Sequence, residues 1–183
     1  MKNWILLLLL TSSIMVTAQE EINWMTMDEA LAAQQSDKNP KRIFMDVYTI
    51  WCGPCIQLDK RTFTNPDLIE FVNENYYPVK FDAEGTETIH YLDNEYTFPN
   101  HKPGLRKQRG QHEFARAMKV QGYPSMAFFD DKGKFIQTIT GYHTPKQLEI
   151  YLKMVANDDY KEIVTSEKWE TYQKEFQYVW RNF

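Results

Sequence analysis

Short apolar runs alternate with amphipathic stretches along the chain, from about residue 22 to residue 156. Apolar runs bounded by turn residues predict strands at 43–48, 77–82, 125–129 and 135–140. Apolar residues at helical spacing predict helices at 26–34, 65–72 and 144–155, and a further helix follows Cys52. This order of elements predicts an α/β fold, a mixed central sheet with helices on both faces.

Local signals mark the ends of several of these elements. Thr26 followed by Glu29 has the pattern of a capping box. Residues 65–67 supply an N-cap asparagine, a first-turn proline and an acid, and residues 144–145 open the last of these helices with threonine and proline. The segment Asp-Asp-Lys-Gly at 130–133 predicts the turn of a hairpin.

The two cysteines of the chain stand in the segment Trp51-Cys52-Gly53-Pro54-Cys55, directly after an apolar strand. This is the layout of a dithiol that opens and closes as a catalytic disulfide. The first sulfur has to be exposed at a helix N-terminus, where backbone N–H groups and the helix dipole stabilise a thiolate. Cys52 is therefore the predicted nucleophile, and Cys55, one turn later, the predicted resolving thiol.

A structural disulfide and a metal site are the two competing interpretations of this pair. So short a loop constrains the unfolded chain by only about 2 kcal/mol, which makes a weak structural crosslink. A metal site lacks further ligands, because no second CxxC exists and the histidines have no zinc-finger spacing: His90, His101, His112 and His143. The pattern favours redox chemistry with no metal, and with no cofactor besides the Cys52–Cys55 disulfide.

The first 18 residues have the pattern of a cleaved secretory signal. Lys2 provides the positive charge, residues 4–10 and 14–16 the apolar core, and residues 16–18 a small-residue cleavage site. The apolar stretch is short for a transmembrane span, and an uncleaved membrane anchor is the alternative. Export predicts a periplasmic or secreted protein, in a compartment where disulfides persist.

Length and charge narrow the classes of protein further. The 183 residues suffice for one good hydrophobic core but hardly for two. The formal net charge of −4 argues against a nucleic-acid partner. We expect one domain at 19–156 after the signal at 1–18, and a C-terminal helical extension at 157–183.

A set of residues in fixed order carries a specific family resemblance. It comprises Asp46, residues 51–55, Lys80, residues 122–125 (Gly-Tyr-Pro-Ser) and Gly141. With this set the chain resembles the thioredoxin family, in its exported bacterial branch of thiol:disulfide interchange proteins. The resemblance covers about 22–156, implies the thioredoxin fold, and leaves out an insertion at about 85–111.

The resemblance implies catalytic roles for Asp46 and Lys80. A carboxylate on an apolar strand is costly to bury, and desolvation raises its pKa toward that of a proton shuttle for Cys55. Asp46 is the implied shuttle, and a solvated strand residue is the alternative. Lys80 resembles the family's lysine beside that acid, with a plain surface lysine as the alternative.

The resemblance also implies a substrate-binding rim of Trp51, Gly53, Pro54, Tyr123 and Pro124. Pro124 resembles the family's cis-proline, whose loop faces the cysteines and offers backbone groups to an extended substrate strand. A trans turn is the alternative. Trp51 is expected on the exposed rim around Cys52, with plain packing as the alternative.

The insertion departs from the family pattern. Residues 89–98 fit an amphipathic hairpin whose two-residue turn is Asp93-Asn94. In that register the apolar side carries Ile89, Tyr91, Tyr96 and Phe98. The connectivity allows this hairpin to lie beside the substrate groove.

Two further segments lie outside the family pattern. A basic run in an acidic protein follows the hairpin, at Lys102, Arg106, Lys107 and Arg109. Such runs are mostly solvated faces, although this one also suits recognition of an acidic partner. The tail has aromatic and apolar residues at helical spacing, at Trp169, Tyr172, Phe176 and Val179. This predicts an added helix packed on the domain, with a partner-binding helix as the alternative.

These features predict an exported thiol-disulfide oxidoreductase that reduces disulfides of envelope proteins through its CxxC dithiol. Its predicted partners are exported thiol or disulfide proteins and a membrane electron donor that keeps it reduced. Gly53 and Pro54 resemble the reducing thioredoxins. A disulfide oxidase or isomerase with the same site is one alternative, and a non-catalytic thioredoxin-fold binding module is the other.

Overall fold

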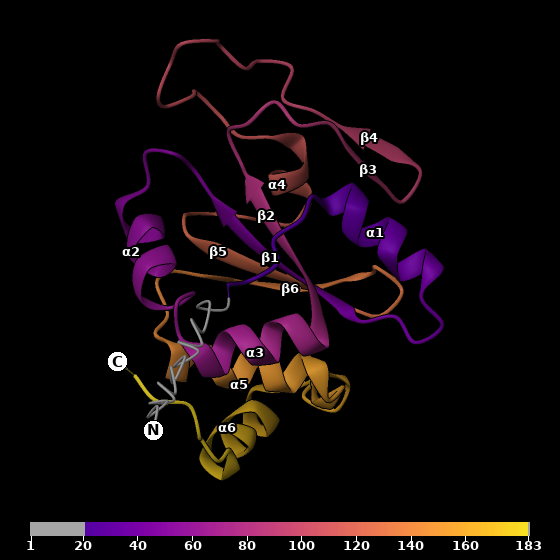
Figure 1. The fold of residues 1–183 in the computed structure, drawn as a ribbon, viewed down its shortest axis with the longest axis vertical. Helices are drawn as coiled ribbons and strands as arrows, with labels where there is room; N and C mark the ends of the chain where they lie inside the picture. The colour runs from indigo at the N-terminus through magenta and orange to yellow at the C-terminus, as the bar shows by residue number, and fades with distance from the viewer. Residues whose placement is uncertain (1–20, 183) are drawn as a thin grey trace, which may run out of the picture.

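The computed structural model describes residues 21–182, arranged as Figure 1 shows. The predicted signal segment at 1–18 lies outside the described residues. The helices are α1 (Met27–Ser36), α2 (Gly53–Arg61), α3 (Pro66–Asn75), α4 (Glu113–Ala117), α5 (Pro145–Ala156) and α6 (Ser166–Glu175), with a 3₁₀ turn η1 (Asp159–Lys161). The strands are β1 (Arg42–Tyr48), β2 (Tyr76–Asp82), β3 (Ile89–Tyr91), β4 (Asn94–Tyr96), β5 (Ser125–Phe129) and β6 (Phe135–Thr140). Within residues 21–182, no helix has the length and hydrophobicity to cross a bilayer.

Four strands form the central sheet, in the order β2-β1-β5-β6. β1 and β2 run parallel, with Asp46 opposite Lys80, and α2 and α3 connect them. β5 runs antiparallel to β1, and β6 runs antiparallel to β5. Asp130 Oδ1 closes the predicted turn between β5 and β6 by accepting the backbone N–H groups of Lys132 and Lys134. The predicted mixed sheet is confirmed.

Alternation of side chains along β1 divides the core into two layers. Ile43, Met45 and Val47 point to the face on which α1 and α4 pack. Phe44 points to the opposite face, which α2, α3 and α5 cover. Asp46 follows Phe44 by two residues and therefore shares the face covered by α2, the helix that carries the cysteines.

The predicted helix starts are confirmed by their caps. Thr26 Oγ1 accepts the backbone N–H of Glu29, and the Glu29 carboxylate accepts that of Thr26 at 2.8 Å. Asn65 Oδ1 caps α3 by accepting the N–H of Leu68 at 3.1 Å. Thr144 opens α5 with a second capping box. Each cap satisfies backbone donors that a helix leaves unpaired, which is why these short signals locate helix ends reliably.

The inserted hairpin is present, but its turn is not the predicted one. Ile89 pairs with Tyr96, so the turn consists of Leu92 and Asp93 instead of Asp93 and Asn94. Leu92 and Asp93 both have positive φ angles, 47° and 61°, as a tight two-residue hairpin turn requires. Asn94 stabilises the turn from its C-terminal side by donating from Nδ2 to the Leu92 carbonyl at 2.7 Å. The apolar side is as predicted, because the pairing shifts by an even number of residues.

The position of the hairpin also differs from the expectation. Ile89 and Tyr91 are buried in the layer of α1 and α4, and the Tyr91 hydroxyl accepts the N–H of Phe135 at 3.1 Å. On the outer side, Asp28 of α1 accepts the backbone N–H of His90 at 2.9 Å. Figure 1 shows the hairpin beside α1, across the molecule from α2. The hairpin does not flank the disulfide, because its apolar side completes the core.

The C-terminal segment contains the predicted added helix, but this helix is shorter than the spacing suggests. α6 packs on α5 through Trp169, whose ring stacks on Tyr151. The helix ends before Phe176, and Val179 is exposed. Beyond it, Trp180 is buried: its ring meets that of Phe71 edge to face, and the buried carboxylate of Glu149 in α5 accepts its backbone N–H at 2.9 Å. This bond attaches the last residues to α5.

Candidate active site

Cys52 and Cys55 form a disulfide at the N-terminus of α2. Cys52 is the N-cap residue, and the two Cα atoms lie 5.3 Å apart. The backbone N–H of Cys55 points to Cys52 Sγ, with an N–S distance of 3.1 Å. An N–H group and the positive end of the helix dipole therefore stabilise negative charge on Cys52 once the disulfide is reduced.

The expected exposure of the first sulfur is wrong for this disulfide form. Cys52 is 2% exposed and Cys55 3%. Cys55 lies on the buried face of α2 together with Leu58. Gly53 and Pro54 are exposed beside the disulfide, as are the neighbouring Ile50 and Ile56. A partner that reaches Cys52 has to contact this largely apolar surface first.

Asp46 is a buried acid on the side of the sheet that α2 covers. Its side chain is 1% exposed, and Oδ2 lies 2.7 Å from Lys80 Nζ. Oδ1 has no hydrogen-bond partner in the described part of the chain. Burial raises the pKa of Asp46 to about 6; the charge of Lys80 opposes this shift, and the charge of Asp59 adds to it. A carboxyl group with this pKa can accept and release a proton near neutral pH.

Lys80 bridges Asp46 and Asp59, an acid on α2. Its ammonium also lies 5.0–5.3 Å from the ring centroids of Trp24, Tyr48 and Phe63. Burial lowers the pKa of Lys80, but the two carboxylates outweigh this effect and raise it. Lys80 thus stays charged, and it is not a plain surface lysine.

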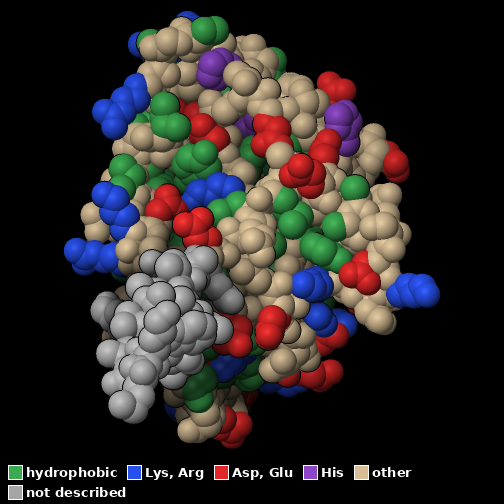
Figure 2. Space-filling model, in the orientation of Figure 1, with side chains coloured by type: hydrophobic (Ala, Val, Ile, Leu, Met, Phe, Trp, Pro, Cys, Tyr) green, Lys and Arg blue, Asp and Glu red, His purple; other side chains and the backbone are tan. Residues whose placement is uncertain are grey.

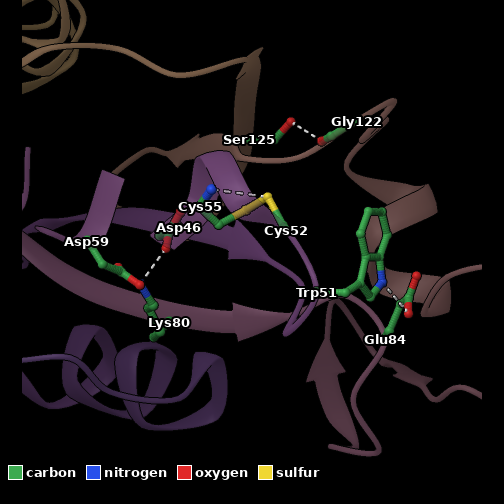
Figure 3. Close-up of a disulfide and its surroundings, with 9 residues drawn as sticks. All are labelled: Asp46, Trp51, Cys52, Cys55, Asp59, Lys80, Glu84, Gly122 and Ser125. Atoms are coloured by element: carbon green, nitrogen blue, oxygen red, sulfur yellow. Dashed lines mark hydrogen bonds and ion pairs between the residues drawn. A yellow bond between two sulfur atoms is a disulfide. The ribbon is translucent and has the colours of Figure 1, made fainter. Parts of the chain in front are cut away.

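The peptide bond between Tyr123 and Pro124 is cis, which excludes the trans turn. The Pro124 carbonyl accepts the N–H of Gly141 at 2.9 Å, and the Ser125 hydroxyl donates to the Gly122 carbonyl at 2.8 Å. In the described part of the chain, the backbone N–H and C=O of Tyr123 have no hydrogen-bond partner. These two groups are available to an extended chain that approaches the disulfide. Figure 3 shows Gly122 and Ser125 on one side of the disulfide.

Trp51 connects the disulfide segment to two loops. Its indole N–H donates to Glu84 Oε2 at 2.9 Å, as drawn in Figure 3. The same carboxylate oxygen accepts the backbone N–H of Gln108 at 2.7 Å. The Trp51 ring meets the Tyr123 ring edge to face, with centroids 6.0 Å apart, and Lys107 Nζ lies 4.2 Å from its centroid. The Trp51 side chain is half-buried, so it both packs against neighbouring residues and contributes to the exposed rim around Cys52.

The structure brings the residues of the predicted site together in two groups around the disulfide. Asp46 and Lys80 lie on the α2 side of the sheet, and Trp51, Tyr123 and Pro124 form the rim. Their chemical roles stay predictions.

Two acids of this site, Asp59 and Glu84, escape the sequence analysis. Asp59 follows Cys55 by four residues, so helical periodicity places both on one face of α2, a signal that was available. Glu84 follows β2 without any motif, and only the tertiary contacts with Trp51 and Gln108 reveal its place in the site.

The sequence matches the thioredoxin-like domain family over residues 27–156, and the protein belongs to this family. The disulfide bond reductase DsbH of Chlamydia pneumoniae is 24% identical over 117 residues, 64% of this chain and 61% of that protein. The thiol-disulfide oxidoreductase ResA of Bacillus thuringiensis is 24% identical over 148 residues, 78% of this chain and 80% of that protein. The chain spans less than two thirds of the length of the first curated relatives that it matches.

A solved structure also resembles this chain. A thioredoxin-fold protein from Helicobacter pylori superposes with a TM-score of 0.55 at 18% identity, covering 80% of this chain and 94% of the other. At this identity the likeness concerns the fold alone. It confirms the thioredoxin fold expected from the sequence.

Proposed function

We propose that this protein is a thiol-disulfide oxidoreductase that reduces disulfides of exported proteins. The observation that carries the proposal is the position of Cys52 Sγ, at a helix N-terminus and 3.1 Å from the N–H of Cys55. Asp46, on the face of the sheet that α2 covers, supplies a group for proton transfer. The names of the relatives DsbH and ResA support the same chemistry.

The first half of the reaction uses Cys52. Its thiolate attacks one sulfur of the client disulfide, so that a Cys52–client bond forms while the client S–S bond breaks. The released client sulfur leaves as a thiolate and takes a proton from water. Apolar residues around the disulfide, Ile50 and Ile56 among them, exclude water from the client chain while it is attached.

The second half uses Cys55 and Asp46. Asp46 accepts the proton of the Cys55 thiol, and the resulting thiolate attacks Cys52. The Cys52–Cys55 disulfide forms, the Cys52–client bond breaks, and the second client sulfur leaves as a thiolate that Asp46 or water protonates. The client gains two electrons and two protons in total. With a pKa of about 6, Asp46 is largely ionised at neutral pH and ready to accept the proton.

Repeated turnover requires a second dithiol that reduces the Cys52–Cys55 disulfide. We assign this step to a membrane electron donor, and the clients to exported thiol or disulfide proteins in the periplasm or outside the cell. The signal-like pattern of residues 1–18 supports this location. The name of the relative DsbH, a disulfide bond reductase, supports the reducing direction.

Insulin reduction and equilibration with glutathione test the activity and its direction. The reduced protein should cleave insulin disulfides, and a Cys52→Ser variant should not. A reductase should equilibrate at a potential below about −200 mV, whereas an oxidase or isomerase lies above about −180 mV. A potential in the higher range would show that the protein oxidises or isomerises disulfides and does not reduce them. If the protein did not reduce insulin, the alternative of a non-catalytic binding module would be favoured.

A further inference from the structure

The inserted loop that follows the hairpin is fastened to the rim of the disulfide. Glu84 joins the Trp51 indole to the backbone N–H of Gln108. The Tyr123 hydroxyl donates to Gln111 Oε1 at 3.0 Å, which fastens the end of the same loop to the residue before the cis-proline. The hairpin itself lies elsewhere, so this loop is the part of the insertion that reaches the site.

The loop is also held in shape from within. The buried side chain of Gln108 accepts the N–H of Lys102 at 2.8 Å and donates to the carbonyls of Lys102 and Leu105 at 3.0 and 2.9 Å. These bonds close the segment from 102 to 108 into a compact turn. Because Gln108 points inward, the basic side chains around it point to solvent. The backbone that carries them is held beside Trp51 through Glu84.

Within the part of the chain that the structure describes, the cations of this loop have no acidic partner. All four are exposed, and none forms an ion pair within residues 21–182: Lys102, Arg106, Lys107 and Arg109. They occur in a protein whose formal net charge is −4. Figure 2 shows Lys and Arg side chains along the upper left edge of the molecule, on the side where Figure 1 draws the loop. Unpaired positive charge beside a reaction site steers negatively charged groups toward it.

We propose that this loop selects client proteins with acidic residues next to the disulfide that is reduced. The inference rests on the proposed reductase function and names its substrate class. The client backbone lies along Tyr123, and the flanking carboxylates meet Lys107 and Arg106. Lys107 Nζ lies 4.2 Å from the centroid of the Trp51 ring and is thus in direct contact with a rim residue.

Three synthetic peptides test the proposal. Each carries the same intramolecular disulfide, and they differ only in four flanking residues, which are all Glu, all Gln or all Lys. We expect the reduced protein to react fastest with the Glu peptide and slowest with the Lys peptide. The ratio of the Glu rate constant to the Lys rate constant should reach about tenfold at low ionic strength and fall toward one in high salt.

Two matched double variants assign the preference to the loop. Arg106→Gln with Lys107→Gln removes two charges of the loop, including that of Lys107 beside Trp51. Lys132→Gln with Lys134→Gln removes the same charge at the β5–β6 turn, at the end of β5 remote from Pro124. The first variant should lower the Glu-to-Lys ratio about threefold or more, and the second should leave it near the wild-type value. A change in the redox chemistry that alters the rate with every peptide equally does not affect the Glu-to-Lys ratio.

The outcomes separate the two proposals. The acidic-client inference would be overturned by equal rates for the three peptides, or by an equal decrease of the Glu-to-Lys ratio in both double variants. Either result would leave the reductase function intact. Reduction of none of the peptides would contradict the reductase function itself. Binding to phosphatidylglycerol vesicles that the Arg106 and Lys107 substitutions abolish, with equal peptide rates, would assign the loop to a membrane surface and also overturn the inference.

Discussion

Lys80 Nζ lies 2.7 Å from Asp46 Oδ2, and this ion pair does not offset the burial of the carboxylate. The pKa of Asp46 is raised from its ordinary value of 3.8 to about 6, chiefly by desolvation. Negative charge on Asp46 therefore destabilises the folded protein, and a bound proton removes this effect. The Asp46–Lys80 pair is therefore suited to proton exchange by Asp46 and does not serve mainly to stabilise the fold.

Asp46→Asn should change the dependence of stability on pH. Because the folded pKa of Asp46 exceeds the unfolded one, the folded state binds more protons between about pH 4 and pH 6. The contribution of this group is fully present below about pH 4 and is lost as the pH rises through about 6. Relative to wild type, the oxidised variant should gain about 2–3 kcal/mol in free energy of unfolding from pH 4 to pH 7. Urea unfolding at both pH values measures the free energy of unfolding of the two proteins. If the difference between variant and wild type were the same at both pH values, the raised pKa of Asp46 would be contradicted.

The same substitution should separate the two steps of catalysis. With dithiobisnitrobenzoate, attack by Cys52 releases the first coloured thiolate, and attack by Cys55 on the mixed disulfide releases the second. Asp46→Asn should slow the second phase by about tenfold or more and the first by less than about twofold, since only the Cys55 proton passes to Asp46. Stopped-flow absorbance resolves both phases. Equal slowing of the two would point to a structural role for Asp46.

Asp59 should act on the reaction through Lys80 and Asp46. Its negative charge raises the pKa of Asp46, so Asp59→Asn should shift the pH midpoint of the second phase to a lower value. Glu70→Gln, at an exposed acid on α3, is the control for a change in net charge. If both variants shift the midpoint equally, the effect is long-range and the bridge through Lys80 contributes nothing.

The inserted hairpin should prove to be part of the core. Ile89 is fully buried, so Ile89→Ala should lower the free energy of unfolding by about 2–4 kcal/mol. Leu92 in the same hairpin is 62% exposed, and Leu92→Ala should cost less than about 0.5 kcal/mol. Urea unfolding of both variants provides the comparison. If Ile89→Ala lowered the free energy of unfolding only slightly, the hairpin would not be part of the core.

Local sequence signals predicted most of the fold because their physics is local. Thr26 and Glu29 satisfy helix donors three residues away, and alternation along β1 already marks Asp46 as an acid among core residues. The cis bond before Pro124 was expected from the family resemblance.

What the sequence did not reveal depends on contacts between distant segments. Glu84 enters the site because it meets Trp51 and Gln108, which no local pattern encodes. An amphipathic hairpin must cover an apolar surface, but its sequence does not say which one. The hairpin covers the layer of α1 and α4, and the loop after it reaches the disulfide. The backbone N–H of Trp180 donates to the side-chain carboxylate of Glu149, 31 residues earlier in the chain.

Trapping the mixed disulfide tests the assignment of Cys52 and Cys55 most directly. A Cys55→Ser variant, reduced and mixed with insulin, should accumulate a covalent adduct that mass spectrometry locates at Cys52. This is expected because the first attack proceeds and the thiol that resolves the adduct is missing. The matched Cys52→Ser variant should form little or none. Adducts in equal amounts at Cys52 and at Cys55 in the two variants, or no adduct in either, would contradict a reductase in which Cys52 attacks and Cys55 resolves.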